Sequence, residues 1–277
     1  MILFFIIFCM ISIAVLWTSI CFFYGIFLFI KKFFKKEQNA LTIPSLSAKW
    51  HSIFFGGLGF FYVPFIFQKI GFYFLPKSLP KVDKTLMLAL VGEVGLLGFI
   101  IFLLCKYKRL RNCIYTPNFC LKTMLIQVFN GFCQCLPLLF VATILWQCFL
   151  NILIKLGLPI TIDFQPIIQL LGKHDPKISS LIALVLCVTI LAPLCEEVFF
   201  RGILLKILSN FINPHKALWI GGFIFAIAHQ HFATLFPLMV LGYWLGLVYI
   251  RTNNIWGNIG IHSLFNGTNL ALILLFK

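Results

Sequence analysis

The sequence predicts an all-α membrane protein, a bundle of about eight transmembrane helices. Hydrophobic residues make up 61% of the 277 residues and charged residues only 10%, a composition that excludes a soluble domain with a charged surface. Apolar runs recur along the chain, and most are long enough to cross a hydrocarbon layer of about 30 Å. Short polar linkers and clusters of Lys and Arg separate these runs.

Four spans are expected in the first 154 residues. They cover 2–30, 52–75, 85–105 and 124–152. Basic runs at 31–36 and 106–111 follow the first and third spans. Because Lys and Arg are enriched in cytoplasmic loops, both runs predict an N-terminus outside the bacterial cytoplasmic membrane. The first span is too long for a signal-peptide core, so we expect it to be retained. Pro137 is expected to kink the fourth span.

Four more spans follow a polar linker that contains Asp163, Lys173, His174 and Asp175. They cover 178–209, 216–231, 234–250 and 255–276. Asn213 and Pro214 are expected to end the first of them. The formal net charge of +15 would suit a nucleic-acid partner, but the basic residues cluster at span ends and are better explained by loop orientation and anionic lipid. The ten cysteines form no metal-binding or disulfide pattern and are expected to be buried thiols.

Three of the seven acidic residues, Glu93, Glu196 and Glu197, lie inside apolar runs. A charged side chain at the bilayer centre costs about 2.5 to 3.5 kcal/mol, so these positions predict a functional site. Glu197 and Arg201 are four residues apart and share one helix face, which predicts a neutralising pair. The Glu196 side chain projects about 100° away from that of Glu197 around the helix. It has no local cation and therefore remains available as a base. The alternative is that Glu196, Glu197 and Arg201 only hold helices together.

Two further predicted helices carry polar side chains. His229 lies four residues after Phe225 on the first, and Asn266 lies four residues after His262 on the second, so each pair shares one helix face. With a rise of 1.5 Å per residue from the presumed cytoplasmic ends, four polar side chains lie about 10 to 18 Å deep and could line one cavity, namely Glu196, His229, His262 and Asn266. Glu93 lies in Val-Gly-Glu-Val-Gly, and its role stays open between close helix approach, hydrogen bonding to a partner and a contribution to the site.

These groups permit two hydrolytic chemistries. In the first, Glu196 and His229 polarise a water molecule while His262 and Asn266 donate to the oxyanion. In the second, a divalent metal such as zinc activates the water, with ligands drawn from Glu196, Glu197, His229 and His262. We favour the metal-free form because Asn266 is more naturally an oxyanion donor than a zinc ligand. A transporter also uses buried Glu, His and Arg, and a non-catalytic scaffold or immunity protein could retain such a site.

Three motifs together resemble the CAAX protease and bacteriocin-processing family (CPBP, or Abi). They are Glu-Glu-Val-Phe-Phe-Arg at 196–201, Phe-Ala-Ile-Ala-His at 225–229 and His-Ser-Leu-Phe-Asn at 262–266. The resemblance implies an intramembrane endopeptidase of the Rce1 type, with Glu196 as base beside His229. It also implies that His262 and Asn266 form the oxyanion hole.

The resemblance divides the chain into a protease core at 178–276 and N-terminal helices at 1–154 that carry no resemblance we can name. Members of the family range from enzymes that trim prenylated proteins to proteins of bacteriocin processing and self-immunity, so the motifs do not transfer a substrate. The expected partners are a peptide or protein substrate, possibly lipid-modified, and membrane lipid, with no nucleic acid.

Overall fold

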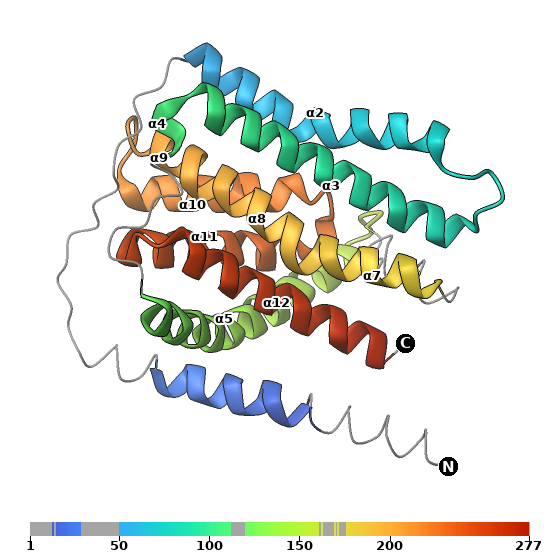
Figure 1. Cartoon of the computed structure of the whole chain (residues 1–277). Helices are drawn as coiled ribbons and strands as arrows, with labels where there is room; N and C mark the ends of the chain where they lie inside the picture. Colours follow the sequence, from blue (N-terminus) through green and yellow to red (C-terminus); the bar gives the residue numbers. More distant parts are fainter. Residues whose placement is uncertain are drawn as a thin grey trace.

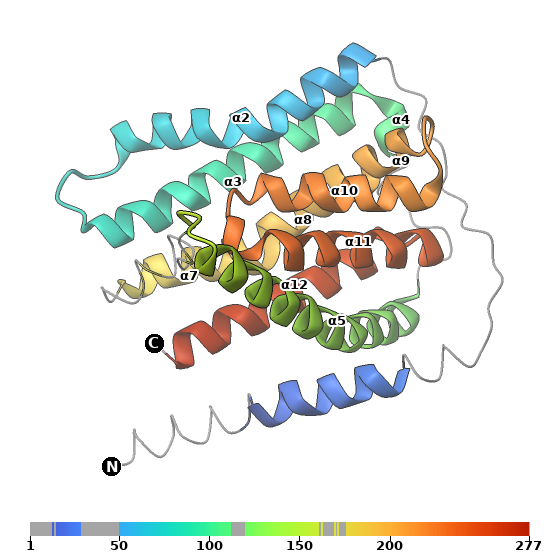
Figure 2. The ribbon, with the colours of Figure 1, turned by 180° about the vertical axis from the view of Figure 1, so that it is seen from behind.

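The computed structural model describes residues 13, 15–28, 50–111, 120–160, 162, 169, 171 and 176–276. Within these ranges the chain forms helices joined by turns, without a strand, which confirms the predicted all-α bundle. The basic run at 31–36 and the linker residues Asp163, Lys173, His174 and Asp175 lie outside the described residues. Most helices run side by side, and α5 crosses beneath them (Figures 1 and 2).

Every span predicted from the second onward corresponds to a helical segment. The longer helices are α2 (Trp50–Phe74), α3 (Lys81–Lys106), α5 (Leu121–Lys155), α10 (Pro214–Ala228), α11 (Leu235–Thr252) and α12 (Ile255–Leu275), with a short α4 at Lys108–Arg111. Four segments of the described chain are long and apolar enough to cross a membrane, namely Lys81–Lys106, Leu121–Lys155, Ile178–Leu208 and Phe232–Thr252. The protein is therefore an integral membrane protein.

The fifth predicted span is one continuous but irregular helix. It consists of α7 (Ile178–Leu186), η1 (Cys187–Leu191), α8 (Ala192–Glu197), η2 (Val198–Leu204) and α9 (Leu205–Leu208), and both η1 and η2 are π-helical. Pro193 provides a reason for η1, because proline lacks an N–H and its ring clashes with the carbonyl group four residues earlier in a regular α-helix. The two glutamates thus lie on a short α-helical piece between two π-helical segments, where such segments often mark functional sites.

Helix α10 begins and ends at residues suited to those positions. Asn213 caps its first turn by accepting a hydrogen bond from the Lys216 backbone N–H, 2.9 Å away, and Pro214 follows at the first helical position. The helix ends at Ala228, three residues before the predicted end of the span. Gln230 has a left-handed backbone with φ of 51°, which reverses the chain. His229 therefore lies at the end of α10, where the chain turns.

Helices α10 and α11 approach each other backbone to backbone. A Cβ atom on Gly222 would lie 2.6 Å from the Met239 carbonyl oxygen, and one on Gly242 would lie 2.8 Å from the Gly222 Cα atom. No side chain larger than hydrogen fits at either position without a shift of the helices. This contact holds α10 and α11 together as a closely packed pair.

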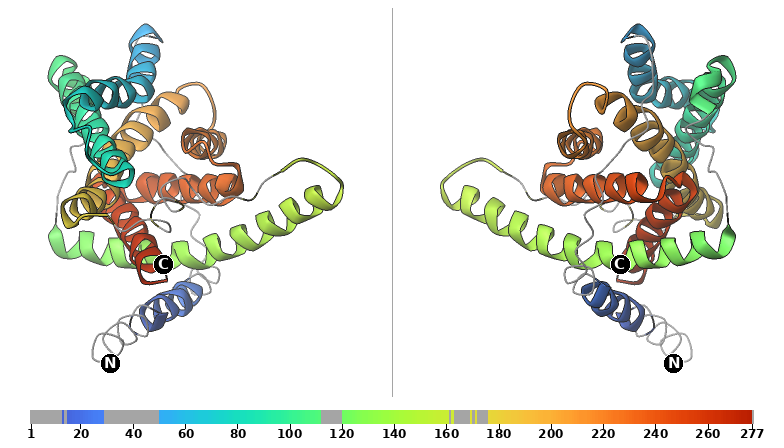
Figure 3. Two further views of the ribbon diagram at one scale, coloured as in Figure 1. Left: turned by 90° about the vertical axis from the view of Figure 1, so that its right-hand side faces the viewer. Right: turned by 90° about the vertical axis from the view of Figure 1, so that its left-hand side faces the viewer.

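Helix α12 lies between the helix that carries the two glutamates and α5. It packs against η1, α8, α11 and α5, and Asn254 caps its N-terminus by accepting from the Gly257 N–H at 3.1 Å. Helix α5 remains continuous through Pro137 and bends along its length (Figure 3). The apolar helix Val15–Leu28 lies beside α5, where Gly25 leaves no room for a side chain against the Cys133 carbonyl group. Helix α8 packs against α3 and α12, whereas α10 contacts the following segments η2 and α9.

Candidate active site

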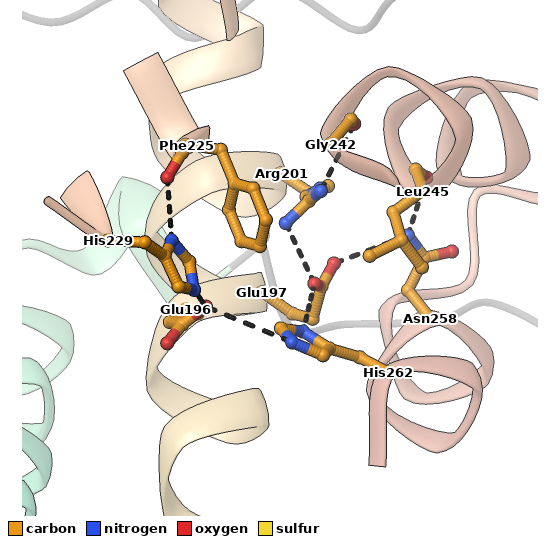
Figure 4. A network of polar contacts seen from close by, with 9 residues as sticks. All are labelled: Glu196, Glu197, Arg201, Phe225, His229, Gly242, Leu245, Asn258 and His262. Carbon is orange, nitrogen blue, oxygen red and sulfur yellow. Dashed lines mark hydrogen bonds and ion pairs between the residues drawn. The ribbon is translucent and has the colours of Figure 1, made fainter. Parts of the chain in front are cut away.

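Glu197 is the centre of a buried polar network that joins several helices. Its side chain has no exposed surface, and three donors surround the carboxylate. Arg201 Nη1 and His262 Nδ1 both lie 2.8 Å from Oε1, and Asn258 Nδ2 lies 3.3 Å from Oε2. Figure 4 shows these side chains converging from η2 and α12 on the glutamate. A buried carboxylate is stable here because opposite charge and hydrogen bonds replace its water.

Arg201 extends the network to α11. Its Nη2 donates to the Gly242 carbonyl oxygen at 3.1 Å, the residue at which α10 and α11 make backbone contact. The guanidinium group also lies over the Phe225 ring, with Cζ 4.9 Å from the ring centroid. The arginine therefore neutralises Glu197 while it fixes the distance between the glutamate helix and α11.

Glu196 points away from this network and has different surroundings. Its side chain is 20% exposed, and Oε2 lies 4.0 Å from His229 Nε2 and 3.9 Å from His262 Nε2. These distances exceed those of direct hydrogen bonds, and Oε2 is a buried atom for which the described residues offer no hydrogen-bond partner. A gap of this size between polar atoms is one that a bridging water molecule can fill.

The hydrogen bonds of the two histidines determine which ring nitrogen faces Glu196. His229 Nδ1 lies 2.8 Å from the Phe225 carbonyl oxygen, which can only accept, so Nδ1 carries the hydrogen. His262 Nδ1 lies 2.8 Å from the Glu197 carboxylate and must likewise donate. In each ring Nε2 remains for the space in front of Glu196, as Figure 4 shows. Two imidazole Nε2 atoms and one carboxylate oxygen therefore surround one place.

Asn266 lies one helical turn beyond His262 on α12, but its hydrogen bond leads elsewhere. Its Nδ2 donates to the Val188 carbonyl oxygen in η1 at 3.0 Å. The amide has two N–H groups, and this bond uses one of them. His231, which sequence analysis did not include in the site, contacts Thr234 instead, with Nδ1 3.0 Å from the hydroxyl oxygen.

Asn258 belongs to the network but is not among the residues predicted from the sequence. This fully buried side chain donates to Glu197 Oε2 and to the Leu245 carbonyl oxygen, the latter at 2.6 Å, and so ties α8 to α11 and α12. A signal was present, because Asn254, Asn258, His262 and Asn266 recur every four residues along an apolar helix and share one face.

Of the four predicted metal-ligand candidates, Glu197 lies apart from the space that Glu196, His229 and His262 border. No group of three or more His, Cys, Asp or Glu side chains in the described part of the chain is arranged to hold a metal ion. Both Glu197 oxygens already accept hydrogen bonds, and His262 Nδ1 is bonded to one of them. Glu197 therefore presents no unoccupied ligand atom to the space in front of Glu196.

Comparison with protein-family models matches residues 178–268 to the family described as type II CAAX prenyl endopeptidase Rce1-like. The resemblance that the three motifs indicated is thereby confirmed for this segment, which carries an Rce1-like domain. The segment runs from α7 into α12 and leaves out α2, α3 and α5. Comparisons with curated proteins and with solved structures give no match.

Proposed function

We propose that the protein is an intramembrane endopeptidase that hydrolyses a peptide bond with a water molecule held by Glu196 and His229. The observation that carries the proposal is the space in front of Glu196, where Oε2 lies 4.0 Å from His229 Nε2 and 3.9 Å from His262 Nε2. The Rce1-like domain supports a protease that acts on peptides or proteins. The unequal surroundings of the two glutamates support a division of roles, with Glu197 structural and Glu196 reactive.

In this mechanism the water donates one hydrogen bond to Glu196 Oε2 and the other to His229 Nε2. Glu196 removes a proton as the water oxygen attacks the carbonyl carbon of the peptide bond. The same proton then passes from the Glu196 carboxyl group to the leaving amine, which restores the carboxylate. His229 keeps its orientation throughout because Nδ1 is bonded to the Phe225 carbonyl group.

The tetrahedral intermediate needs hydrogen-bond donors directed at its oxyanion. His262 donates from Nε2 when its ring carries a hydrogen on both nitrogens, and the Glu197 carboxylate holds the ring in place through Nδ1 at 2.8 Å. Asn266 supplies a second donor through the N–H that is not bonded to Val188. Glu197 thereby acts on the oxyanion through His262 without contacting the substrate.

A cleavage assay in membranes tests the proposed function. Wild-type protein and Glu196→Gln are expressed separately, and each membrane fraction receives a farnesylated fluorogenic peptide that ends in the modified cysteine and three aliphatic residues. New protein termini in the two fractions are mapped by mass spectrometry. We expect termini and peptide products that require Glu196. Indistinguishable termini and no peptide cleavage in either fraction would refute the endopeptidase.

Activity without a bound metal is a separate expectation of this mechanism. Purified protein should contain less than stoichiometric zinc, and treatment with a chelator followed by buffer exchange should leave kcat/KM within about twofold, because Glu196 and His229 polarise the water without a Lewis acid. Metal content by mass spectrometry and peptide cleavage are measured on the same samples. Stoichiometric metal lost together with activity, with both restored by zinc, would contradict the expectation.

The proposed orientation places the N-terminus outside and the basic runs inside. An alkaline phosphatase reporter inserted after Gly157, which follows α5, is therefore expected to be active, whereas one placed after Arg111 should be inactive. Paired fusions to a reporter that works only in the cytoplasm provide the control. A cytoplasmic signal from the position after Gly157 would reverse the topology and place the site in the opposite half of the bilayer.

A further inference from the structure

Glu93 is a carboxyl group in the interior of a membrane-spanning helix, and it lies outside the segment that matches the protease family. It occupies the middle of α3, a helix that is otherwise almost entirely apolar. Its Oε2 is buried and has no hydrogen-bond partner within the part of the chain that the structure describes. Such a group is costly in hydrocarbon, so its presence requires a role or a partner beyond the described residues.

The packing of α3 places Glu93 opposite the glutamate helix. Leu86 belongs to a buried cluster with Leu184 of α7, whereas Leu96 belongs to the core cluster that includes Cys195 of α8. The two helices run in the same direction (Figure 1), so the part of α3 between these two leucines faces the part of the glutamate helix between 184 and 195. Glu93 lies two turns after Leu86 and one turn before Leu96, on the same face.

The opposite face of α3 is closed by α2. A Cβ atom on Gly92 would lie 2.7 Å from Gln68 Nε2, and one on Gly95 would overlap the Phe67 ring. These two glycines allow α2 to pack closely against α3, on the side turned away from Glu93. The carboxyl group of Glu93 is thus directed from α3 toward η1 and α8, which α3 also contacts.

Glu93 and Glu196 lie on helices that pack against each other, α3 and α8. Each has a buried Oε2 without a hydrogen-bond partner among the described residues. In Figure 4 the Glu196 carboxyl group points away from Glu197, toward the side where the green ribbon of α3 passes. Two unsatisfied oxygens from two different helices indicate a place built to receive hydrogen-bonding groups from outside the chain, because buried polar atoms are almost always paired.

We propose that Glu93 is a substrate-binding residue, whose carboxyl group hydrogen bonds a backbone group of the peptide held against Glu196. The inference rests on the proposed function. A peptide that is cut inside a membrane must be extended at the scissile bond, and its backbone groups then lose their helical partners where no bulk water replaces them. A carboxyl group accepts from a peptide N–H whether or not it is protonated. The active site therefore includes α3, and the Rce1-like segment is incomplete without it.

Thermal unfolding of Glu93→Leu distinguishes this role from a structural one. If Glu93 serves the substrate, its replacement by an apolar side chain removes an unsatisfied buried group, and Tm should stay equal or rise. Asp83→Asn is the matched control on the same helix, because the Asp83 carboxylate accepts from the Lys177 backbone N–H at 2.8 Å and holds α7 in place. That variant should lower Tm. A lower Tm for Glu93→Leu would show that the protein itself uses the carboxyl group and would overturn the inference.

Peptide binding supplies the second measurement. The farnesylated peptide is titrated into the full-length Glu196→Gln protein in detergent, with and without a substitution at Glu93, and Kd is read from fluorescence anisotropy. Glu93→Leu should raise Kd about tenfold, the effect of one hydrogen bond to a polar group. Glu93→Gln keeps an acceptor oxygen at nearly equal volume, so its Kd should stay within about threefold. Asp83→Asn should leave Kd unchanged in protein that remains folded.

The two proposals fail in different ways. Wild-type protein that neither cleaves the peptide nor creates new termini would refute the endopeptidase, and the Tm of Glu93→Leu would still decide whether Glu93 has a partner within the protein. Activity that requires Glu196, combined with wild-type KM and Kd for Glu93→Leu, would refute the role of Glu93 alone. A raised KM with kcat within about threefold, restored by Glu93→Gln, is the result that supports it.

Discussion

Glu196→Gln is expected to lower kcat by about 10³-fold or more, with Tm unchanged or slightly raised. The amide has nearly the volume of the carboxylate but cannot accept the proton of the attacking water, and loss of a general base typically costs about 10² to 10⁴ in rate. No hydrogen bond within the protein is lost at Oε2, because that oxygen has no partner in the described chain. Single-turnover cleavage of the farnesylated peptide and thermal unfolding give the two readouts.

Glu196→Asp is the control for this result. It keeps a carboxylate but withdraws it by one methylene group from His229 and His262, so it should retain a measurable part of the activity that Glu196→Gln loses. Glu196→Gln with kcat within tenfold of wild type would contradict the assignment of the base. An equal loss in the Asp and Gln variants would instead indicate that the distance of about 4 Å to both histidines is as important as the charge.

Glu197→Gln is expected to destabilise the protein by about 3 to 5 kcal/mol, the typical cost of removing one partner from a buried ion pair. Arg201 would remain buried without its counter-charge, and Asn258 and His262 would lose a charged acceptor. We therefore expect poor accumulation in membranes and a lower unfolding midpoint. Equilibrium unfolding in mixed micelles, together with protein levels, measures the effect.

A double-mutant cycle provides the control for the ion pair. Arg201→Met alone should be about as harmful as Glu197→Gln, whereas the double variant should be less destabilised than the sum of the two, because no uncompensated charge remains. Additive losses would show that the pair contributes through packing and hydrogen bonds to other residues and not through its charge. A fully stable but inactive Glu197→Gln would assign this glutamate to the reaction instead.

Helix extents and the Glu197–Arg201 pairing could be predicted because they depend on local sequence. An apolar run must become a helix in a membrane, and residues four apart on a helix share a face whatever surrounds them. The same spacing correctly placed Phe225 beside His229, where the structure adds a hydrogen bond from the imidazole to the Phe225 carbonyl group.

Features that depend on contacts between helices could not be predicted. The direction in which Glu93 points is set by the packing of Gly92 and Gly95 against α2, which no spacing within α3 specifies. The bond from Asn266 to Val188 requires α12 to lie against η1. His229 reaches the site from the C-terminal end of α10, and the helix stops there because the next residue, Gln230, adopts a left-handed conformation, an unusual one for a residue other than glycine.

The π-helical segments make chain length part of the site. A π-helical segment accommodates one residue more than a regular α-helix would hold over the same distance, and each added residue turns all later side chains by about 100°. With η1 and η2 on either side, the orientation of Glu196 toward His229 and His262 depends on how many residues precede it as much as on which residues they are. A related chain could therefore keep every polar side chain of the site, lose one apolar residue upstream of Pro193, and no longer present the carboxylate to the histidines.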